Sequence, residues 1–217
     1  MNPLENYKKF KNIPVPNCME NLDKDRRGFP IPANVYRDPK TGDAMFKVND
    51  VELEKDLIDN QVCYISKKPL TEDNIRFIGS PLSSMPDHLR RVTDGPICLD
   101  AALYALKVCP YMALSEYYKG YNPEKVKALN ENGDGSTFID PTQTTLQPPY
   151  FVLMHPRMVQ VKFDPKIGYL FYIIGANSPD RFFRFGEEID TTEAAKLLKS
   201  YLETPEIKEL IRNSQNG

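Results

Sequence analysis

The stretch DGPICLDAALYALKVCP, from Asp94 to Pro110, is the most apolar part of this 217-residue chain, and the fold depends on it. Its apolar residues recur at spacings of three and four, which is the period of one helix face. Pro110 disfavours helical geometry in the residue before it and ends or kinks the helix there. Only Asp100, Tyr104 and Lys107 are expected to face away. A helix this apolar must be covered on several sides, so the sequence predicts a central, buried helix.

Composition excludes several classes of protein. The 28 basic and 30 acidic residues give a net charge of −2, so no field of one sign indicates a nucleic-acid or membrane partner. The chain has no apolar run of membrane-spanning length, and its start, MNPLENYKKFKN, lacks the apolar core of a signal peptide. We therefore expect a soluble, cytoplasmic protein that does not enter a membrane. In that setting its four cysteines are expected to be reduced thiols or ligands.

Residues 1–33 are rich in proline and form an expected N-terminal arm. Ile13-Pro14-Val15-Pro16 and Phe29-Pro30-Ile31-Pro32 repeat one pattern. Alternating prolines fix φ and remove backbone donors, so both tetrads should be extended. The arm either wraps onto the domain through its apolar side chains or serves as a proline-rich ligand for another protein.

The middle of the chain alternates between strand and helix patterns. Turn residues at 38–43 predict a hairpin with strands at 35–37 and 44–48. A helix is expected at 51–60, strands at 61–65 and 75–78, and a loop at 79–86, followed by the central helix.

After the central helix, the sequence predicts helical pieces at 111–119 and 123–130 and a flexible loop at 132–149, which has no apolar period. Expected strands at 150–154, 158–163, 168–174 and 181–185 read as an antiparallel meander. Asp190 with Glu193 marks a helix start for 191–202, and Pro205 starts a last helix to about 213. Strands and helices are segregated, so we predict a single α+β domain over 1–217, with antiparallel strands and hairpins around the central helix.

Catalytic motifs are hard to find. Neither His88 nor His155 lies in a recognisable nucleophile motif, and no glycine-rich phosphate loop is present. An enzyme would have to use Asp87, His88 and Asp100, the polar residues nearest to the expected centre. We expect no cofactor.

The cysteines suggest the remains of a metal site. A structural zinc site commonly takes one Cys pair from a turn and a second pair from a helix. Here Cys63 is followed three residues later by Ser66, and Cys98 by Ala101, so half of each pair is missing. Cys109 or His88 could complete a site. Buried thiols without metal are the alternative, because free cysteine packs well as a small apolar side chain.

Five segments carry a resemblance to an uncharacterised family of bacterial and bacteriophage proteins. They are IPVPNCMENLDKDRRGFPIP, CYISKKPL, FIGSP, DGPICLDAALYALKVCPYM and FFRFGEEIDTTEAA. Members of that family have an IPxP arm, a CxxC turn, an HxDC helix that ends in Cys-Pro-Phe, and an FRxGEP-like strand. The family pattern resembles a structural zinc module, and it implies no activity.

The resemblance assigns a place to each position of the degenerate site. Cys63 matches the first family cysteine and Ser66 replaces the second, while Cys98 stands at the histidine and Ala101 replaces the helix cysteine. Asp100 and the Cys109-Pro110 pair match. Because three of four ligand positions differ, we expect the protein to fold without metal. We also expect Cys63, Ser66, Cys98 and Ala101 to meet at one spot.

Three functions remain open. The first is a non-catalytic binding or regulatory protein, phage-encoded, that acts on a protein partner. The second is a nucleic-acid-associated module descended from a zinc-binding domain, in which Lys67, Lys68, Arg90 and Arg91 contact phosphates. The third is an enzyme whose site the sequence does not identify.

Overall fold

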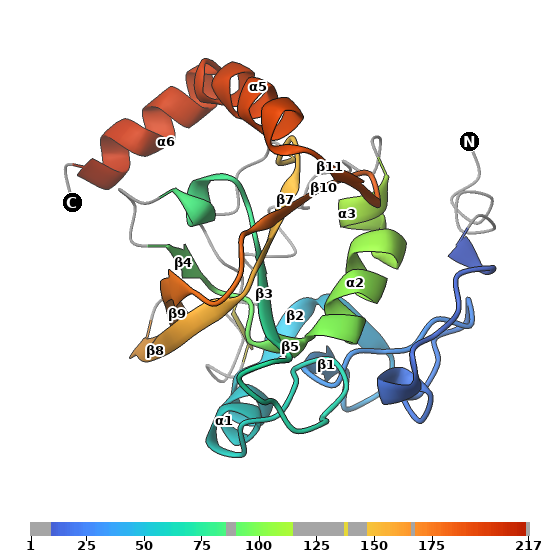
Figure 1. Cartoon of the computed structure of the whole chain (residues 1–217). Coiled ribbons are helices and arrows are strands. Elements are labelled where there is room, and N and C mark those ends of the chain that lie inside the picture. Colours follow the sequence, from blue (N-terminus) through green and yellow to red (C-terminus); the bar gives the residue numbers. More distant parts are fainter. Residues whose placement is uncertain (1–9, 86–89, 115–136, 139–146, 166–167, 216–217) are drawn as a thin grey trace.

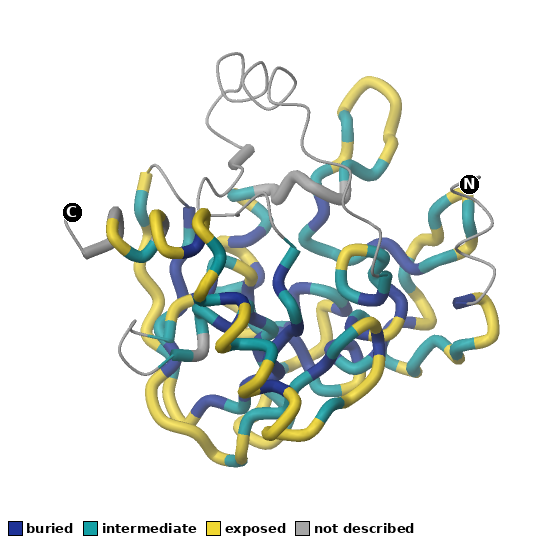
Figure 2. Tube along the Cα trace, turned by 90° about the horizontal axis from the view of Figure 1, so that it is seen from above, coloured by how far each residue is buried: buried dark blue, intermediate teal, exposed yellow. Residues whose placement is uncertain are grey.

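The computed structural model describes residues 10–85, 90–114, 137–138, 147–165 and 168–215. The chain is α+β, and its C-terminal series of strands is followed by two helices, as predicted. Helix α2 (Leu99–Val108) lies on one side of the central strands in Figure 1 and the hairpin of residues 156–176 on the other, while helices α5 (Thr191–Leu202) and α6 (Pro205–Gln215) lie along one edge of the molecule. Buried residues gather in the interior and exposed segments surround them (Figure 2).

The described strands and helices follow each other along the chain. The strands are β1 (Val35–Arg37), β2 (Ala44–Asp50), β3 (Ile75–Gly79), β4 (Arg91–Val92), β5 (Ile97–Cys98), β6 (Thr137–Phe138), β7 (Phe151–Met154), β8 (Pro156–Asp164), β9 (Gly168–Ala176), β10 (Arg181–Arg184) and β11 (Glu187–Ile189). The helices are the short 3-10 turns η2 (Asn17–Met19) and η3 (Leu82–Ser84), and α1 (Val51–Asp59), α2 (Leu99–Val108), α3 (Pro110–Ala113), α5 (Thr191–Leu202) and α6 (Pro205–Gln215).

The strands within the described residues form three antiparallel sheets. Their orders are β1-β2-β6, β11-β10-β7-β3-β5 and β4-β9-β8. The expected C-terminal meander is wrong in its pairing, because β7 pairs with β10 and β3, while β8 and β9 form a hairpin in a separate sheet. The physical reason is burial. All four residues of β7 are buried, so β7 lies in the middle of the largest sheet, whereas most of β8 is exposed.

Helix α2 begins later than the sequence predicts. Ile97 and Cys98 pair with Arg76 and Ile75 of β3, and the helix starts only at Leu99. Strand pairing therefore takes the first residues of the apolar stretch before the helix begins. From Leu99 onward the prediction of a buried helix is confirmed. Its core face contains Ala101, Ala102 and Leu106, each of which is at most 1% exposed.

One residue of α2 lies on a different face from the one that the sequence predicts. Tyr104 is buried, whereas Asp100 and Lys107 are exposed as expected. The N-terminal arm accounts for this difference, since Ile13 and Pro14 lie beside Tyr104. The arm is thus wrapped onto the domain, as the first of the two readings predicted.

Residues 61–65 do not form the expected strand. Val62 makes only an isolated bridge to Pro69, and the chain between them folds into a tight turn. In this turn the N–H of Lys67 donates to the carbonyl of Cys63, and the N–H of Cys63 donates to the carbonyl of Lys68. Lys67 has a φ of 57°, a left-handed conformation that closes the turn. We call residues 62–69 the knuckle turn.

Other local expectations are confirmed. The β1–β2 hairpin, helix α1 and helices α5 and α6 lie where the sequence places them. Asp190 caps α5 by accepting a hydrogen bond from the N–H of Glu193 at 2.8 Å. The helix expected at 123–130 and most of the loop expected at 132–149 fall outside the described residues. Within that loop, β6 pairs with the end of β2.

Among the described residues, no helix is both long enough and apolar enough to cross a membrane.

Candidate functional site

The knuckle turn holds the Cys63 thiol at the base of helix α2. Two backbone N–H groups donate to its Sγ atom, from Ser66 at 3.4 Å and from Cys98 at 3.3 Å. Cys63 has no exposed surface, so these donors take the place of water. Because one donor belongs to the knuckle turn and the other to the start of α2, the sulfur links the two elements.

Cys98 is the N-cap residue of α2, and its side chain lies between three groups. Its Sγ atom is 3.7 Å from Ser66 Oγ and 3.7 Å from Cys18 Sγ, and its backbone N–H donates to Cys63 Sγ. Of the four positions of the degenerate site, Cys63, Ser66 and Cys98 lie together, and Ala101 follows Cys98 by one turn of α2. We call Cys18, Cys63, Ser66 and Cys98 the thiol cluster.

Cys18 is a member of the cluster that the sequence does not single out. It lies 80 residues before Cys98, in the η2 turn of the arm, and no spacing signal connects the two. The candidates named instead do not join the cluster. Cys109 follows the last residue of α2, at the opposite end of the helix from Cys98, and His88 falls outside the described residues.

The cluster favours a negative charge on one sulfur. The pKa of Cys98 is lowered to about 7, first because the Cys63 thiol donates to it and further because the Ala101 N–H and Ser66 point to the same sulfur. The pKa of Cys63 is raised, since its proton is held by Cys98 and burial disfavours its charged form. Burial also raises the pKa of Cys18 and of Cys109. Cys98 is therefore the most acidic thiol of the group.

No group of three or more His, Cys, Asp or Glu side chains within the described parts of the chain is arranged to hold a metal ion. The chemistry of the donors explains this finding. Ser66 offers a neutral hydroxyl where a second thiolate would be needed, and Ala101 offers only its backbone N–H, which donates and cannot coordinate.

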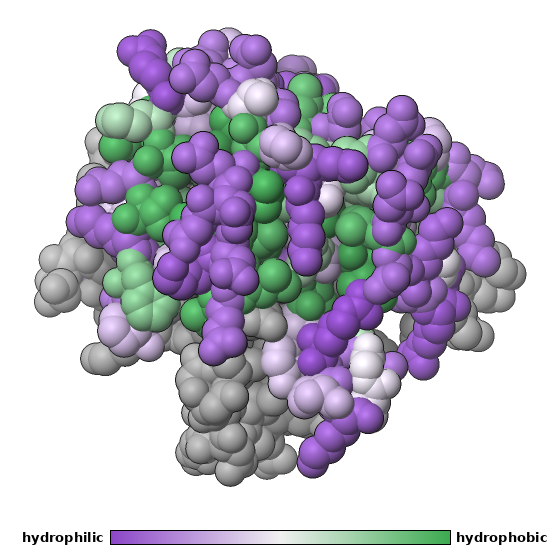
Figure 3. Space-filling view, turned by 90° about the horizontal axis from the view of Figure 1, so that it is seen from below, coloured by the Kyte–Doolittle hydropathy of each residue, from purple (hydrophilic) through white to green (hydrophobic). Residues whose placement is uncertain are grey.

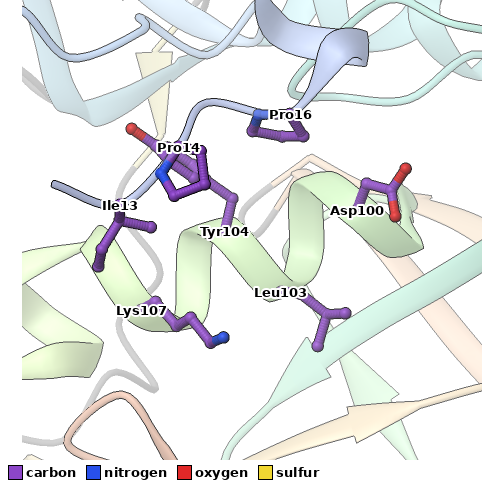
Figure 4. Close-up of a pocket in the computed structure, with 7 residues that line it drawn as sticks. All are labelled: Ile13, Pro14, Pro16, Asp100, Leu103, Tyr104 and Lys107. Atoms are coloured by element: carbon purple, nitrogen blue, oxygen red, sulfur yellow. The ribbon is translucent and has the colours of Figure 1, made fainter.

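A groove of about 200 Å³ runs between the arm and α2 (Figure 4). Its walls are mostly apolar, with a carboxylate towards one end and an ammonium group towards the other. The lining residues are Ile13, Pro14, Pro16, Asp100, Leu103, Tyr104 and Lys107. The groove follows the interface between the arm and helix α2.

The residues suggested for phosphate binding have different environments. Lys67 and Lys68 are exposed in the knuckle turn, and Arg91 is exposed in β4. Arg90 instead forms an ion pair with Asp180, because its Nη2 donates to both carboxylate oxygens of that residue, at 2.7 and 2.8 Å. An arginine held by a carboxylate has lost much of its attraction for phosphate.

The residues suggested for an enzyme are not brought together in the part of the chain that is described. Asp87 and His88 fall outside it, and Asp100 is an exposed residue of the groove. His155 gains a serine partner that the sequence did not indicate: its Nδ1 lies 3.1 Å from Ser178 Oγ, and its Nε2 lies 2.8 Å from the Glu72 carbonyl. These contacts tie together three loops at the ends of strands.

The outer hairpin strand β8 carries the most prominent exposed apolar surface. Met158, Val161 and Phe163 are 56%, 39% and 54% exposed. Ile174 on the neighbouring strand β9 is also exposed and lies directly opposite Met158. Figure 3 shows hydrophobic residues at the surface among hydrophilic ones on one face of the molecule. The alternating sequence predicted this strand, but its exposure follows only from the fold.

No protein-family model, curated protein or solved structure matches this chain.

Proposed function

We propose that this protein is a non-catalytic binding protein that pairs with an extended segment of a partner protein along strand β8. The observation that carries the proposal is the row of exposed apolar side chains on a long edge strand. β8 is the last strand in the order β4-β9-β8, and β9 pairs with it from Pro156 to Asp164. Among the described strands, none pairs with its other edge.

An open edge of this kind is suited to strand addition. Its outward N–H and C=O groups can continue the antiparallel ladder, and side chains at alternate positions then select the partner. Soluble proteins usually shorten or cover such edges, because a long apolar edge pairs readily with other chains. β8 is nine residues long, well above the usual five or six. Its length and apolar surface therefore favour a binding role.

The two faces of β8 specify the chemistry of the partner. Residues opposite each other in the β8–β9 ladder share a face, which places Val161 and Phe163 with the buried Phe171 side of the hairpin. Apolar partner side chains at alternate positions would extend that face. On the other face, the Lys162 ammonium lies 5.1 Å from the Tyr172 ring centre. An acidic partner residue opposite Lys162 would complement this charge.

Selection from a displayed library of random peptides tests the proposal with the full-length protein as target. The expected winners alternate apolar residues and include an acidic one. Their binding should fall at least about tenfold for Val161→Lys and for Phe163→Lys, because either change removes apolar burial and adds a charge. Lys199→Glu, on the exposed side of α5, is the matched control and should leave binding unchanged.

Hydrogen exchange of the winning complexes locates the contact. Amides of β8 should be protected by a bound peptide, while those of α5 should exchange as before. Peptides that bind both lysine variants as tightly as the wild type, or that protect another element, would overturn the proposal. Self-association through β8, seen by sedimentation and abolished by Val161→Lys, would refute the proposal of a different partner protein. It would show instead that β8 binds a second copy of this chain.

The family resemblance adds a setting for this function, namely a phage-encoded regulator of a host or phage protein. The nucleic-acid alternative has weaker support, since Arg90 is held by Asp180 and only Lys67, Lys68 and Arg91 are exposed. A gel-shift series at increasing salt distinguishes the two, because phosphate binding weakens steeply with salt whereas strand addition does not.

A further inference from the structure

We propose that Cys18 and Cys98 form a reversible disulfide that fastens the N-terminal arm to helix α2. This inference does not depend on the proposed function, because it concerns the thiol cluster and the arm. Cys18 belongs to the arm and Cys98 to the first turn of the core helix, so a bond between them would join the two covalently. Their sulfur atoms already touch, at 3.7 Å.

The geometry leaves a short distance to close. A disulfide bond is about 2.0 Å long, so the sulfurs must approach by roughly 1.7 Å from their 3.7 Å separation. Cys18 lies in a three-residue 3-10 turn without a side-chain cap, and its side chain is partly exposed. Met19 of the same turn is buried in the core, so rotation of the Cys18 side chain, rather than movement of the turn, must close the distance. Cys98 is fixed by its place at the start of α2 and provides the stationary partner.

The pairing choice follows from the surroundings of the third thiol. Cys63 is fully enclosed and accepts two backbone N–H donors, so moving its sulfur towards Cys98 would leave both donors without a partner. Cys18 has no comparable anchor and faces solvent in part. Cys63 has a different task here, since its thiol proton stabilises a thiolate at Cys98 and lowers the pKa of that residue.

Hydrogen peroxide, a small oxidant that can reach a nearly buried sulfur, would supply the oxidising equivalents. The Cys98 thiolate attacks one peroxide oxygen; the S–O bond forms, the O–O bond breaks, and hydroxide leaves to take up the proton that Cys98 has released. The Cys18 sulfur then attacks the sulfenic sulfur, its proton passes to the departing oxygen, and water leaves. Two thiols and one peroxide thus give one disulfide and two waters. A dithiol reductant reverses the bond by thiol exchange.

The arm offers a direct readout of the bond. Lys24 and Arg26 are exposed in the turn of the arm, so trypsin can cut there. In the reduced protein, the fragment that carries Cys18 should separate from the core under denaturing conditions. After peroxide treatment it should stay attached until a reductant is added, and the intact chain should lose the mass of two hydrogen atoms. Peptide mapping should find Cys18 joined to Cys98.

Two variants supply the controls. Cys109→Ser leaves the thiol cluster intact and should form the bond like the wild type. Cys18→Ser should fail to retain the fragment, and its Cys98 should collect stable oxygen adducts, because the resolving thiol is gone. Closing an 80-residue loop should also raise the melting temperature of the oxidised wild type by roughly 10 °C, with no rise for Cys18→Ser.

Several results would overturn the inference. A Cys63–Cys98 bond in the peptide map, a bond between two chains, or an unchanged mass after peroxide would each do so. If Cys18→Ser loses its circular dichroism signal, Cys18→Ala replaces it, and arm retention in that variant after oxidation would also contradict the proposed pairing.

Discussion

Gly95 packs directly against the ring of Tyr64, so closely that a Cβ atom at position 95 would overlap the ring. Tyr64 belongs to the knuckle turn and is almost fully buried. Its N–H donates to the carbonyl of Pro96 at 2.9 Å, and its ring meets the edge of Phe171. The contact therefore joins the knuckle turn to the segment that leads into α2.

Gly95→Ala should destabilise the protein by about 3 kcal/mol or more, because the added methyl group has no space and the buried ring cannot move away. Urea unfolding followed by circular dichroism measures the change. The penalty should shrink in the Tyr64→Leu background, where the overlapping ring atoms are absent. An equal penalty in both backgrounds would show that the ring is not the obstacle.

Arg90→Ala should cost about 1 to 3 kcal/mol, because it leaves the partly buried carboxylate of Asp180 without its two hydrogen bonds. Both side chains are less than a fifth exposed. Arg37→Ala is the control, since its pairing with Asp23 is exposed and should contribute less than about 1 kcal/mol. Chemical unfolding measures the free energy of unfolding of both variants. Equal losses of stability would contradict the larger contribution expected of the Arg90–Asp180 pair.

The Cys98 thiol should ionise with a midpoint near pH 7. The ultraviolet absorbance of the thiolate measures this titration, and the Cys98→Ser variant supplies the background absorbance. Cys63→Ala should move the midpoint upwards, because the strongest donor to this sulfur is removed. The folded pKa lies below that of an unfolded cysteine, so ionisation of Cys98 stabilises the fold at alkaline pH. That contribution is lost as the pH falls through 7. A midpoint unaffected by Cys63→Ala would contradict this account.

The wild-type protein should fold without zinc and keep its melting temperature in a chelator, because Ser66 and Ala101 supply no thiolate. The double variant Ser66→Cys, Ala101→Cys should bind zinc stoichiometrically, since Ser66 contacts Cys63 and Cys98 and Ala101 lies one helical turn after Cys98. Elemental analysis of the two purified proteins measures the zinc content per chain and tests both expectations. Stoichiometric zinc in the wild type, with unfolding on chelation, would refute the first expectation.

Local signals predicted the elements that depend on neighbouring residues. Asp190 caps α5 because its carboxylate reaches an N–H three residues ahead. In the same way, Asp38 organises the β1–β2 turn by accepting from the N–H of Lys40 at 2.7 Å. The apolar period of α2 identified a buried helix, and the comparison with a zinc-site pattern singled out Cys63, Ser66 and Cys98, which lie together.

Tertiary structure decided which surfaces meet across the chain. The pairing of β7 with β10 depends on burial of β7 on both faces, and an apolar run alone does not name its neighbour. The approach of Cys18 to Cys98 depends on how the arm lies along α2, which no short-range pattern encodes. The alternating sequence of β8 specifies a strand, but the fold leaves Phe163 facing solvent. The sequence by itself therefore determined the helices and the β1–β2 hairpin, because these depend on contacts within a few residues. Packing between distant segments decides the strand order, the position of the arm and the exposed edge of β8. The free energy of folding depends there on which apolar surfaces cover one another, and no short stretch of sequence specifies that choice.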